Sequence, residues 1–494
     1  MTEDAHRDPP PQVVAYGATP STTDPEGDPA IPAPSGGKRV SSWPMWALGL
    51  VILMDEIDKN IVRGLIDPLK DEFGVGDFGI GVLLSSFIII NGIITVPAGY
   101  LADRWHRTRT IGHTVVAWSA LTAAGAAAPT FPALVGMRSL LGFGQAITEP
   151  SAASLIGDYY PVDQRGKAFS IQQVMLLAGV GLGVAIGGTL ETAFGWRWAL
   201  VVVSLPGIIV AAFIYRLREP KRGAADKLSM GATTELEFGH EPHELFDGGF
   251  VTFVKDMIDG LRADMRTILS IKTMKYALVG VAALLFTITA VAAWLPQFYI
   301  RHLGIEEGRG EQLFGILAIV GGVPGVLVGG RVADRYATKI QGGRLALPAI
   351  FLFVGNTFFT ASYAIRTFAP AYALQIVGLF VVTMSIPGLR AGLTDAVPAH
   401  LRGAGFGAFN LVAVIFGAAA APSVVAALSS MFDENLRSAF LLVTPAVFIG
   451  SIVLFHARKF LDDDMQKIFM AVMTAMQEEQ ARQAAHHQPE ATGE

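Results

Sequence analysis

The sequence contains no cysteine among its 494 residues. This absence excludes disulfide bonds, thiolate metal sites, covalent haem attachment and catalysis by a cysteine nucleophile. Charged residues are also scarce, because Asp, Glu, Lys and Arg supply 16% of the chain, against about 25% in soluble globular proteins. Hydrophobic residues make up 52% and the mean hydropathy is +0.46, so the composition indicates a polytopic membrane protein.

The signatures of several functional classes are missing as well. The chain has no G-x-x-x-x-G-K-[ST] run and therefore no phosphate-binding loop for ATP. It has no H-E-x-x-H run, and its ten histidines are scattered, which argues against a metal site. A net charge of −5 provides no basic footprint for nucleic acid. We therefore expect a protein that is not an enzyme and that binds no metal, cofactor or nucleic acid.

What the chain does have is a series of long hydrophobic runs, which begins at Trp43. Residues 1–42 are proline-rich and polar, and we expect a disordered tail without a signal peptide. Each run is long enough to cross a hydrocarbon layer of about 30 Å. We predict an all-α membrane protein with twelve transmembrane helices, at 43–66, 78–101, 109–128, 132–157, 166–190, 196–216, 273–300, 311–331, 345–366, 370–393, 403–429 and 436–457.

The polar segment in the middle of the chain divides these helices into two groups of six. The expected domains are the tail 1–42, a first bundle 43–216, a central loop 217–272, a second bundle 273–457 and a C-terminal tail 458–494. Lys and Arg are concentrated in the central loop and in the connections on its side. The opposite connections hold only Lys70, Arg197, Arg301, Arg309, Arg366 and Arg437. This asymmetry predicts that both termini lie in the cytoplasm. We expect the protein in the plasma membrane.

Two segments outside the predicted spans have helical periodicity. In the central loop, apolar residues from Phe250 to Ile268 recur at helical spacing with Lys255, Arg262 and Arg266 between them. This pattern fits an amphipathic helix on the membrane surface and, equally well, a solvated linker helix. Beyond Lys459 a similar period continues to Met476, and we expect the Gln- and Ala-rich end to fray.

Two motifs occur twice, at matching helix ends. The sequence Gly99-Tyr-Leu-Ala-Asp103-Arg104 follows the second span, and Gly330-Arg-Val-Ala-Asp334-Arg335 follows the eighth, 231 residues later. A D-x-x-P-x-x-x-R-G motif ends the fourth span, from Asp158 to Arg165 and Gly166, and ends the tenth, from Asp395 to Arg402 and Gly403, 237 residues later. Two motifs repeated in the same order indicate two related bundles.

These features resemble the major facilitator superfamily over nearly all of residues 43–457, since the stretch from Gly99 to Arg109 is similar to its signature loop. The resemblance implies pseudo-symmetric six-helix bundles around a central cavity and transport by alternating access. Glycine allows close helix approach, and the aspartates can take cationic partners. A cytoplasmic gate is then expected from Gly99, Asp103, Arg104, Asp158, Arg165, Asp334, Arg335, Asp395 and Arg402. The alternative is that these cations serve topology alone.

A narrower resemblance is to the bacterial Spinster-like transporters. Asp58-Lys59-Asn60, followed by Pro68-Leu69-Lys70, is similar to the Asp-Arg-Gln and Pro-Ile-Lys pattern of their first helix. Arg138-x-x-x-Gly142-x-Gly144-Gln145-Ala146 resembles their Arg-x-x-x-Gly-x-Gly-Glu-Ala in the fourth. The resemblance implies export of lysophospholipids or sphingolipid signals, with proposed proton coupling. Two departures are Lys59 in place of arginine and Gln145 in place of glutamate, although a carboxylate follows at Glu149.

Charged residues inside spans are costly and by default mark a pathway or a relay. The first span holds Asp55, Glu56, Asp58, Lys59 and Arg63, and the fourth places Arg138, Gln145 and Glu149 on one helix face. Such helices should line a hydrated cavity. We expect the proton-coupling carboxylates among Asp55, Glu56, Asp58 and Glu149, with Lys59, Arg63 or Arg138 as switching partner. The alternative is a static ion-pair network between the two helices.

The second half of the chain should supply a different kind of cavity wall. From Tyr276 to Ile300 its seventh span has Trp294, Gln297 and Tyr299 but no charge, and Arg390 is the only clear mid-membrane charge of this half. A cavity with one charged and one apolar wall suits an amphiphile. Its expected lining is Lys59, Arg63, Arg138, Gln145, Trp294, Gln297, Tyr299, Arg390 and Asn410.

We therefore predict a monomeric, proton-coupled or proton-sensitive secondary transporter of lysophospholipid or a similar lipid, in contact with membrane lipids and without a cofactor other than protons. Two alternatives stay open: a proton-coupled multidrug or organic-anion carrier, and an uncoupled lipid-flipping or sensor protein. The absence of a clustered nucleophile and base argues against a lipid-modifying enzyme.

Overall fold

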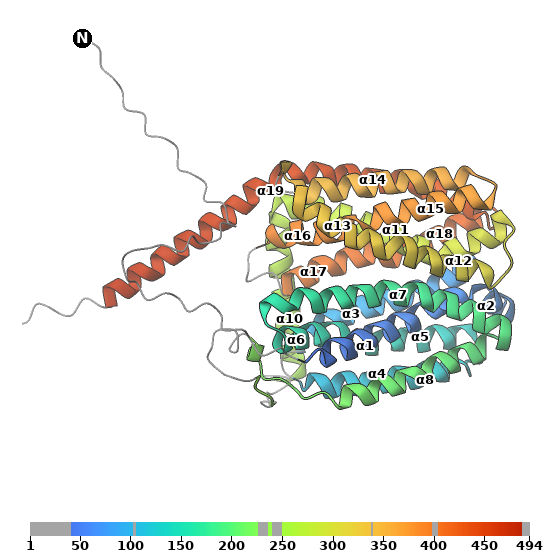
Figure 1. Ribbon diagram of the computed structural model, residues 1–494, viewed down its shortest axis with the longest axis horizontal. Helices are drawn as coiled ribbons and strands as arrows, with labels where there is room; N and C mark the ends of the chain where they lie inside the picture. The colour runs from blue at the N-terminus through green and yellow to red at the C-terminus, as the bar shows by residue number, and fades with distance from the viewer. Residues whose placement is uncertain are drawn as a thin grey trace, which may run out of the picture. The chain divides into compact units, whose positions relative to one another are not determined.

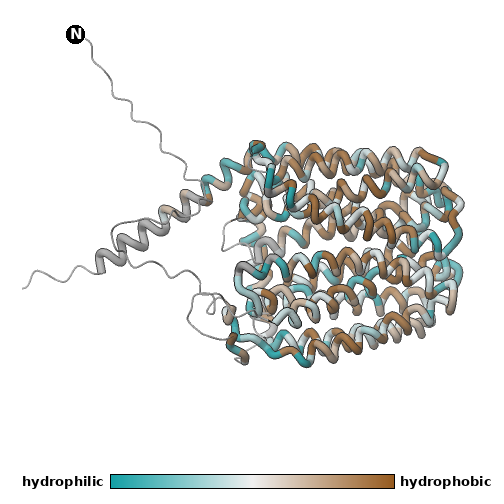
Figure 2. The backbone as a smooth tube through the Cα atoms, in the orientation of Figure 1, coloured by the Kyte–Doolittle hydropathy of each residue, from teal (hydrophilic) through white to brown (hydrophobic). Residues whose placement is uncertain are grey.

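Helices make up nearly all of the structure, which is a computed structural model describing residues 41–101, 105–225, 236–239, 249–336, 339–397 and 404–486. Within these ranges the only strand-like pairing is a bridge between Pro220 and Phe238. The helices of the first half lie together, as do those of the second half (blue to green and yellow to red in Figure 1). Hydrophobic residues follow the middle of the helices and hydrophilic residues gather at both ends (Figure 2).

The first half contains six crossing segments. Their elements are α1 (Trp43–Ile61) with the 3₁₀ turn η1 (Val62–Gly64) and the short α2 (Ile66–Phe73), α3 (Asp77–Leu101), α4 (Arg107–Gly125), α5 (Phe131–Gln145) with α6 (Thr148–Tyr159), α7 (Val162–Phe194), and α8 (Trp196–Tyr215).

The second half repeats this arrangement after α10 (Phe250–Ser270). Its elements are α11 (Lys272–Leu303), α12 (Arg309–Leu317) with η2 (Ala318–Gly322) and α13 (Val323–Tyr336), α14 (Gly343–Ala364), α15 (Phe368–Thr383) with α16 (Ser385–Asp395), α17 (Ala404–Ala413) with η5 (Val414–Ala419) and α18 (Ala420–Met431), and α19 (Leu436–His486). The predicted twelve-helix architecture is confirmed.

Nine of these segments in the described chain are long and apolar enough, by length and composition, to cross a membrane. The other three are the first, third and fourth of the series. In the first, α1 carries four charges; α4 is less apolar; and the fourth is divided into α5 and α6, of which α5 has only 15 residues.

The crossing segments at the fourth and tenth positions are both broken. In each, a proline stands at the third position of the helix after the break, Pro150 in α6 and Pro387 in α16. Because proline lacks a backbone N–H, it leaves a carbonyl in the preceding turn without its helical donor. The eighth and eleventh segments instead contain π-helical turns, η2 and η5. Neither type of irregularity was predicted.

Glycines of α7 bring that helix close to its neighbours. A Cβ added at Gly183 would lie 2.7 Å from the Ile57 carbonyl oxygen of α1, and one at Gly187 would lie 2.6 Å from that of Ile61. At Gly181, the same atom would lie 2.9 Å from the Gly315 carbonyl oxygen of α12. Glycine is required at these positions because the two backbones are in contact there.

Two helices extend beyond the crossing segments. The predicted amphipathic helix is α10, and it packs against α11 and α17, so part of its apolar stripe faces protein. The C-terminal helix α19 runs to His486, beyond Met476, where the predicted helical period ends (Figure 1). Its last turns are rich in Gln, Glu, Arg and Ala, which are strong helix formers.

Candidate functional site

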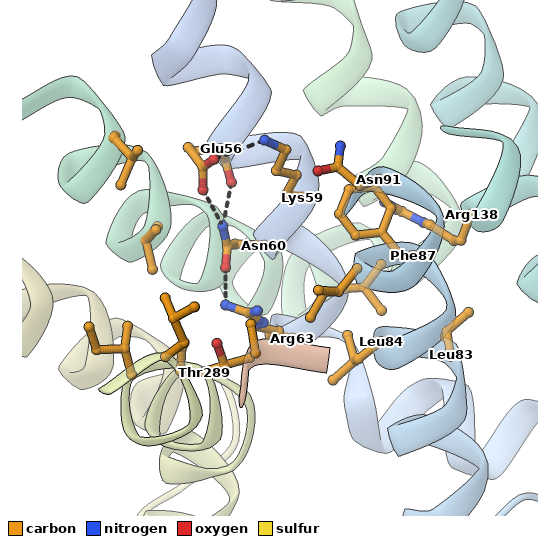
Figure 3. Close-up of a pocket in the computed structure, with 18 residues that line it drawn as sticks. Glu56, Lys59, Asn60, Arg63, Leu83, Leu84, Phe87, Asn91, Arg138 and Thr289 are labelled. Carbon is orange, nitrogen blue, oxygen red and sulfur yellow. Dashed lines mark hydrogen bonds and ion pairs between the residues drawn. The ribbon is translucent and has the colours of Figure 1, made fainter. Parts of the chain in front are cut away.

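The charged side chains of α1 form a connected group (Figure 3). Lys59 Nζ lies 2.6 Å from Asp55 Oδ2 and 3.0 Å from Glu56 Oε1. The Asn60 amide donates to Glu56, at 2.7 Å to its carbonyl and 3.3 Å to Oε2, and accepts a hydrogen bond from Arg63. Arg63 is placed at the cavity by η1, which follows α1 directly. Its Nε is buried and has no partner among the residues that the structure describes.

Asp58 lies on a different side of α1 and is 4% exposed. Its carboxylate accepts from Thr122 Oγ1 of α4 at 2.7 Å and from Gln145 Nε2 of α5 at 2.8 Å. Arg138 donates to the backbone carbonyl of Asp58 at 3.1 Å, and its Nη2 has no partner in the described part of the chain. Asp58 is thus held by neutral side-chain donors, whereas Asp55 is paired with a lysine.

A cavity of about 310 Å³ lies between the two halves beside this group (Figure 3). Its polar wall consists of Glu56, Lys59, Asn60, Arg63 and Arg138, with Asn91 of α3. Its opposite wall comes from α11 and is mainly apolar, with Leu285, Ile288, Thr289 and Ala292. The site therefore presents charge on one side and hydrocarbon on the other.

A larger cavity of about 600 Å³ adjoins the first and shares Ile88, Asn91 and Ala418 with it. Its lining includes Glu149 of α6 and Asn410 of α17, both exposed. These side chains lie closer to the end of the bundle that carries α10, which we call the α10 end.

Several predicted lining residues lie elsewhere. Gln145 bonds to Asp58, and Trp294 is fully buried, with its indole N–H donating to the Pro422 carbonyl at 3.1 Å. Tyr299 packs edge-on against Phe368 and Tyr372. The remaining residues that do not line either cavity are Gln297 and Arg390. The side chains of residues 294–299 of α11 lie beyond the cavity. Helix periodicity predicts which face of a helix a side chain occupies, but it does not predict how far along the helix the cavity extends.

An ion network at the opposite end of the bundle, here the α2 end, was not predicted. Asp77, at the start of α3, is fully buried and binds the Arg301 guanidinium through two contacts of 2.7 and 2.9 Å. It also accepts from Lys70 at 2.9 Å and from Ser429 at 3.0 Å. Lys70 and Asp77 belong to the first half, and Arg301 and Ser429 to the second. The network therefore ties the two halves together.

A strained turn supports this network from the second half. Lys70 Nζ also lies 2.8 Å from Glu434 Oε2. Glu434 and its neighbour Asp433 both have positive φ, 60° and 52°. Left-handed backbone costs roughly 1–2 kcal/mol for a residue such as glutamate, so the surrounding contacts hold this turn in place. The available sequence signal was that Lys70 and Arg301 are among the few cations on their side.

At the α10 end, the predicted gate residues pair within their own halves. Asp158 Oδ2 lies 2.5 Å from Arg107, and Asp395 pairs with Arg344. Arg165 donates to the carbonyls of Tyr160 and Gly157, at 2.9 and 2.6 Å. Gly99 lines the larger cavity, and Arg335 lies beside Tyr336. The predicted gate residues Asp103, Arg104 and Arg402, and the side chain of Asp334, are outside the described residues.

The residues after α8 fold back onto α4 and α6 around Glu219. Its carboxylate accepts from Arg107 Nε at 2.7 Å and from the Thr108 amide at 2.9 Å. Burial alone would raise the pKa of Glu219, but the Thr108 amide and the Arg107 guanidinium outweigh it and hold this pKa below its usual range. Residues 218–224 therefore form a strap across the end of the first half.

In the part of the chain that the structure describes, no three His, Asp or Glu side chains are placed to hold a metal ion. The arrangement instead offers binding to an amphiphile, through guanidinium and ammonium groups on one wall and aliphatic side chains on the other. The carboxylate of Asp58 also accepts one hydrogen bond each from Thr122 and Gln145, two side chains that can reorient.

The chain is similar in sequence to several known proteins. Protein spinster homolog 3 of Danio rerio is 25% identical over 459 residues, covering 88% of this chain and 87% of that protein. Sphingosine-1-phosphate transporter SPNS2 of Danio rerio is 25% identical over 304 residues, or 58% of this chain and 56% of that protein.

Solved structures with the same fold include a bacterial homolog of the human lysosomal transporter Spinster in an inward-facing, unoccupied conformation. It has a TM-score of 0.66 at 19% identity, covering 88% of this chain and 99% of that chain. A D-xylose-proton symporter has a TM-score of 0.60 at 16% identity, with 84% and 98% coverage.

The sequence profile of the Major Facilitator Superfamily matches residues 48–422. Because members of this superfamily are transporters, the prediction that the chain is not an enzyme is confirmed. The predicted resemblance to Spinster proteins is confirmed as well, by the relatives just described. The chain is a multi-pass membrane transporter that belongs to the Major Facilitator Superfamily.

Proposed function

We propose that this transporter moves lysophospholipid, or a similar single-chain amphiphilic lipid, by alternating access. The observation that carries the proposal is the cavity between the halves, with Lys59, Arg63 and Arg138 on one wall and Leu285 and Ile288 on the other. An anionic or zwitterionic headgroup would pair with the cations while the acyl chain contacts the aliphatic wall. The name of SPNS2, a sphingosine-1-phosphate transporter, supports an amphiphilic lipid as substrate.

We further propose that transport is coupled to protons, with Asp58 as the group that exchanges them. Thr122 and Gln145 fit both states of this carboxyl, because a hydroxyl can donate or accept, and Gln145 Oε1, which has no partner among the described residues, can accept after the amide turns. Arg138, whose Nη2 likewise has no partner in the described part of the chain, is the nearby charge that substrate binding would redirect. The alternative role, a static ion pair that does not exchange protons, fits Asp55 better, because Asp55 is already paired with Lys59.

We propose a monomer in the plasma membrane. On the basis of the Lys and Arg asymmetry between the connections, we place both termini in the cytoplasm. The α10 end then faces the cytoplasm. The cavities reach that end, whereas the Asp77 network seals the other, as expected for an inward-facing state.

Reconstituted vesicles test this function. Fluorescent lysophosphatidylcholine would be added, and albumin would extract whatever remains in the outer leaflet, so that the protected fraction reports crossing. The expected result is protein-dependent crossing that increases when a pH gradient is imposed. Equal crossing with and without the gradient would indicate uncoupled flipping. Gradient-driven uptake of a cationic dye without lysolipid crossing would indicate a multidrug carrier instead.

A further inference from the structure

The outer face of the second half carries a groove between α14 and α19, which run side by side (Figure 1). Its volume is about 250 Å³, and it shares no residue with the central cavity or the larger cavity. The apolar side chains that line it include Ile350, Phe353 and Val354 of α14 and Ile452 and Phe455 of α19. The hydroxyl of Ser451, also in the lining, donates to the Val447 carbonyl of its own helix at 2.9 Å. The groove therefore offers hydrocarbon to a ligand.

The groove faces the membrane. Both of its helices are long and apolar enough to cross a bilayer. Ile350 and Phe353 are each 41% exposed, and Ile452 is 59% exposed. Large apolar side chains exposed on the crossing helices of a membrane protein meet acyl chains. The ring of Phe353 lies 4.7 Å from that of Phe448, between centroids, and these two rings bound the groove toward the α2 end.

A cation stands at the α10 end of the groove. The central guanidinium carbon of Arg458 lies 4.1 Å from the centroid of the Phe455 ring, so the charge covers one of the side chains that line the groove. The backbone at Arg458 is fixed against the start of α14, because a Cβ added at Gly342 would lie 2.2 Å from the Arg458 carbonyl oxygen. Between Phe448 and Arg458 α19 rises about 15 Å, which is room for much of one acyl chain.

The Arg458 guanidinium has hydrogen-bonding capacity to spare. Its Nε is buried, and no residue of the described chain accepts from it. The neighbouring charges are engaged elsewhere, since Arg344 of α14 pairs with Asp395 and Asp462 accepts from the Gly342 amide at 3.3 Å. A guanidinium can stack on an aromatic ring and bind phosphate oxygens through parallel hydrogen bonds at the same time. Phosphate is thus the ligand group that this stacked cation suits.

We propose that the groove between α14 and α19 binds one anionic phospholipid, with an acyl chain along Phe353 and Ile452 and the phosphate on Arg458. The proposed orientation places the α10 end in the cytoplasm, and the cytoplasmic leaflet is the one that is rich in anionic lipid. This lipid is a bound ligand of the second half and not the transported substrate, because its groove is separate from both cavities. It holds α14 and α19 together from outside.

Native mass spectrometry of the full chain in a neutral detergent tests the site. The probes are phosphatidylglycerol and phosphatidylcholine with identical chains, and the occupancy of the first bound lipid gives an apparent Kd for each. We expect phosphatidylglycerol to bind at least about tenfold more tightly, because only its headgroup brings a net negative charge to Arg458. It should also raise the Tm, since a ligand that binds only the folded state stabilises that state.

One pair of variants tests the headgroup contact. Arg458→Gln removes the charge and should weaken phosphatidylglycerol binding about tenfold or more, while its effect on phosphatidylcholine stays small. The matched control is Lys459→Gln, which removes an exposed cation from the next position of α19. It should change the Kd less than about twofold.

A second pair tests the acyl-chain contact. Ile350→Trp places a larger side chain in the groove and should weaken phosphatidylglycerol binding about tenfold although Arg458 is intact. The matched control is Val377→Trp in α15, which changes an apolar side chain of the same exposed fraction, 41%, that does not line the groove. It should leave the Kd nearly unchanged.

Several results would overturn the site. Equal affinity for the two lipids would remove the charged headgroup contact, and equal losses in Arg458→Gln and Lys459→Gln would assign the attraction to the general charge of this end. Binding that survives Ile350→Trp would place the lipid outside the groove. Because no lysolipid takes part in these measurements, each of these results would leave the proposed transport function standing.

Discussion

The carboxylates of α1 differ in the donors that they meet. Asp55 and Glu56 share the ammonium group of Lys59, whereas Asp58 accepts from a hydroxyl and an amide. A buried carboxylate whose side-chain donors are neutral is expensive as an anion, and both donors here can reverse or turn. This contrast is why Asp58, and not its neighbours, is our candidate for proton exchange.

The variant Asp58→Asn should therefore uncouple transport. A gradient of one pH unit is worth about 1.4 kcal/mol per proton and sustains up to about tenfold accumulation of the coupled substrate. In the variant we expect no accumulation above equilibrium, although lysolipid should still equilibrate across the vesicle membrane. Accumulation would be measured by albumin extraction at a series of gradients.

Asp55→Asn is the matched control for this experiment. It removes a carboxylate that is paired with Lys59, at the same level of α1, and should lower the rate but keep the response to the gradient. A full gradient response in Asp58→Asn would assign coupling to another carboxyl.

At the residue scale the sequence predicted the charged wall well. Five charges within one span cannot face lipid, so Lys59 and Arg63 had to lie toward a cavity. The same logic grouped Asp58 with them, and the structure turns it toward α4 and α5 instead. A helical face spans several neighbours, and only the packed structure selects which neighbour each side chain meets.

Among the elements, α7 depends on glycine where it touches α1. Gly183→Ala should destabilise the protein, because the new Cβ would stand 2.7 Å from the Ile57 carbonyl oxygen and 2.9 Å from Asn60 Cβ. Overpacking of this kind costs about 1–3 kcal/mol. The matched change Gly136→Ala meets no atom within 4 Å and should stabilise α5 by up to about 1 kcal/mol. Thermal unfolding in detergent should show Tm shifts of opposite sign, and shifts of equal sign would contradict the packing argument.

The strap after α8 makes a second prediction at this scale. Glu219→Gln replaces a charged acceptor of the Arg107 guanidinium and the Thr108 amide, and should lower the free energy of unfolding by about 1.5–3 kcal/mol. The control is Glu237→Gln, whose contact with Lys221 is longer, at 3.6 Å, and more exposed. That change should cost less than about 1 kcal/mol.

The effect of Glu219 on stability should also depend on pH. Its pKa is held below the usual range, so its contribution is complete above the pKa of an unfolded glutamate, about 4.3, and is lost as pH falls through the lower folded value. The Tm difference between the wild-type protein and Glu219→Gln should therefore be constant near neutral pH and shrink below about pH 4. A difference that grows on acidification would contradict the sign of this pKa shift.

Element boundaries show where sequence reasoning stops. Hydropathy located all twelve segments, because each must satisfy its own backbone groups in lipid. It did not reveal the breaks before Pro150 and Pro387 or the π-helical turns, which depend on how neighbouring helices supply or withhold backbone partners. Hydropathy also does not locate the end of the last helix, because hydropathy falls after Lys459 while helix propensity does not.

On the scale of the whole molecule, the two-bundle architecture could be predicted from the sequence, but the contacts that join the two halves at the α2 end could not. The repeated motifs implied two related bundles, and the superfamily match confirms the fold. The network at the α2 end joins residues 70, 77, 301, 429 and 434 from both halves. No periodicity within one helix could bring these positions together, because their meeting depends on how the two bundles are oriented.

That network makes the last prediction, which concerns the balance between the two states of the transporter. Asp77→Asn removes the buried charge that Arg301 and Lys70 share, and losing one member of a buried ion pair costs about 3–5 kcal/mol. This cost falls on the state that is closed at the α2 end. The population should therefore shift toward the state open at that end.

Because the chain has no cysteine, a single introduced thiol reports the shift directly. Thr289→Cys in the cavity should react with a membrane-impermeant maleimide added on the α2 side at least about tenfold faster when combined with Asp77→Asn. Glu72→Gln is the matched control, since Glu72 pairs with Arg197 at 2.8 Å at the same end but within the first half. It should leave the labelling rate nearly unchanged. Equal acceleration by both variants would mean that charge at this end, and not the contact between halves, sets accessibility.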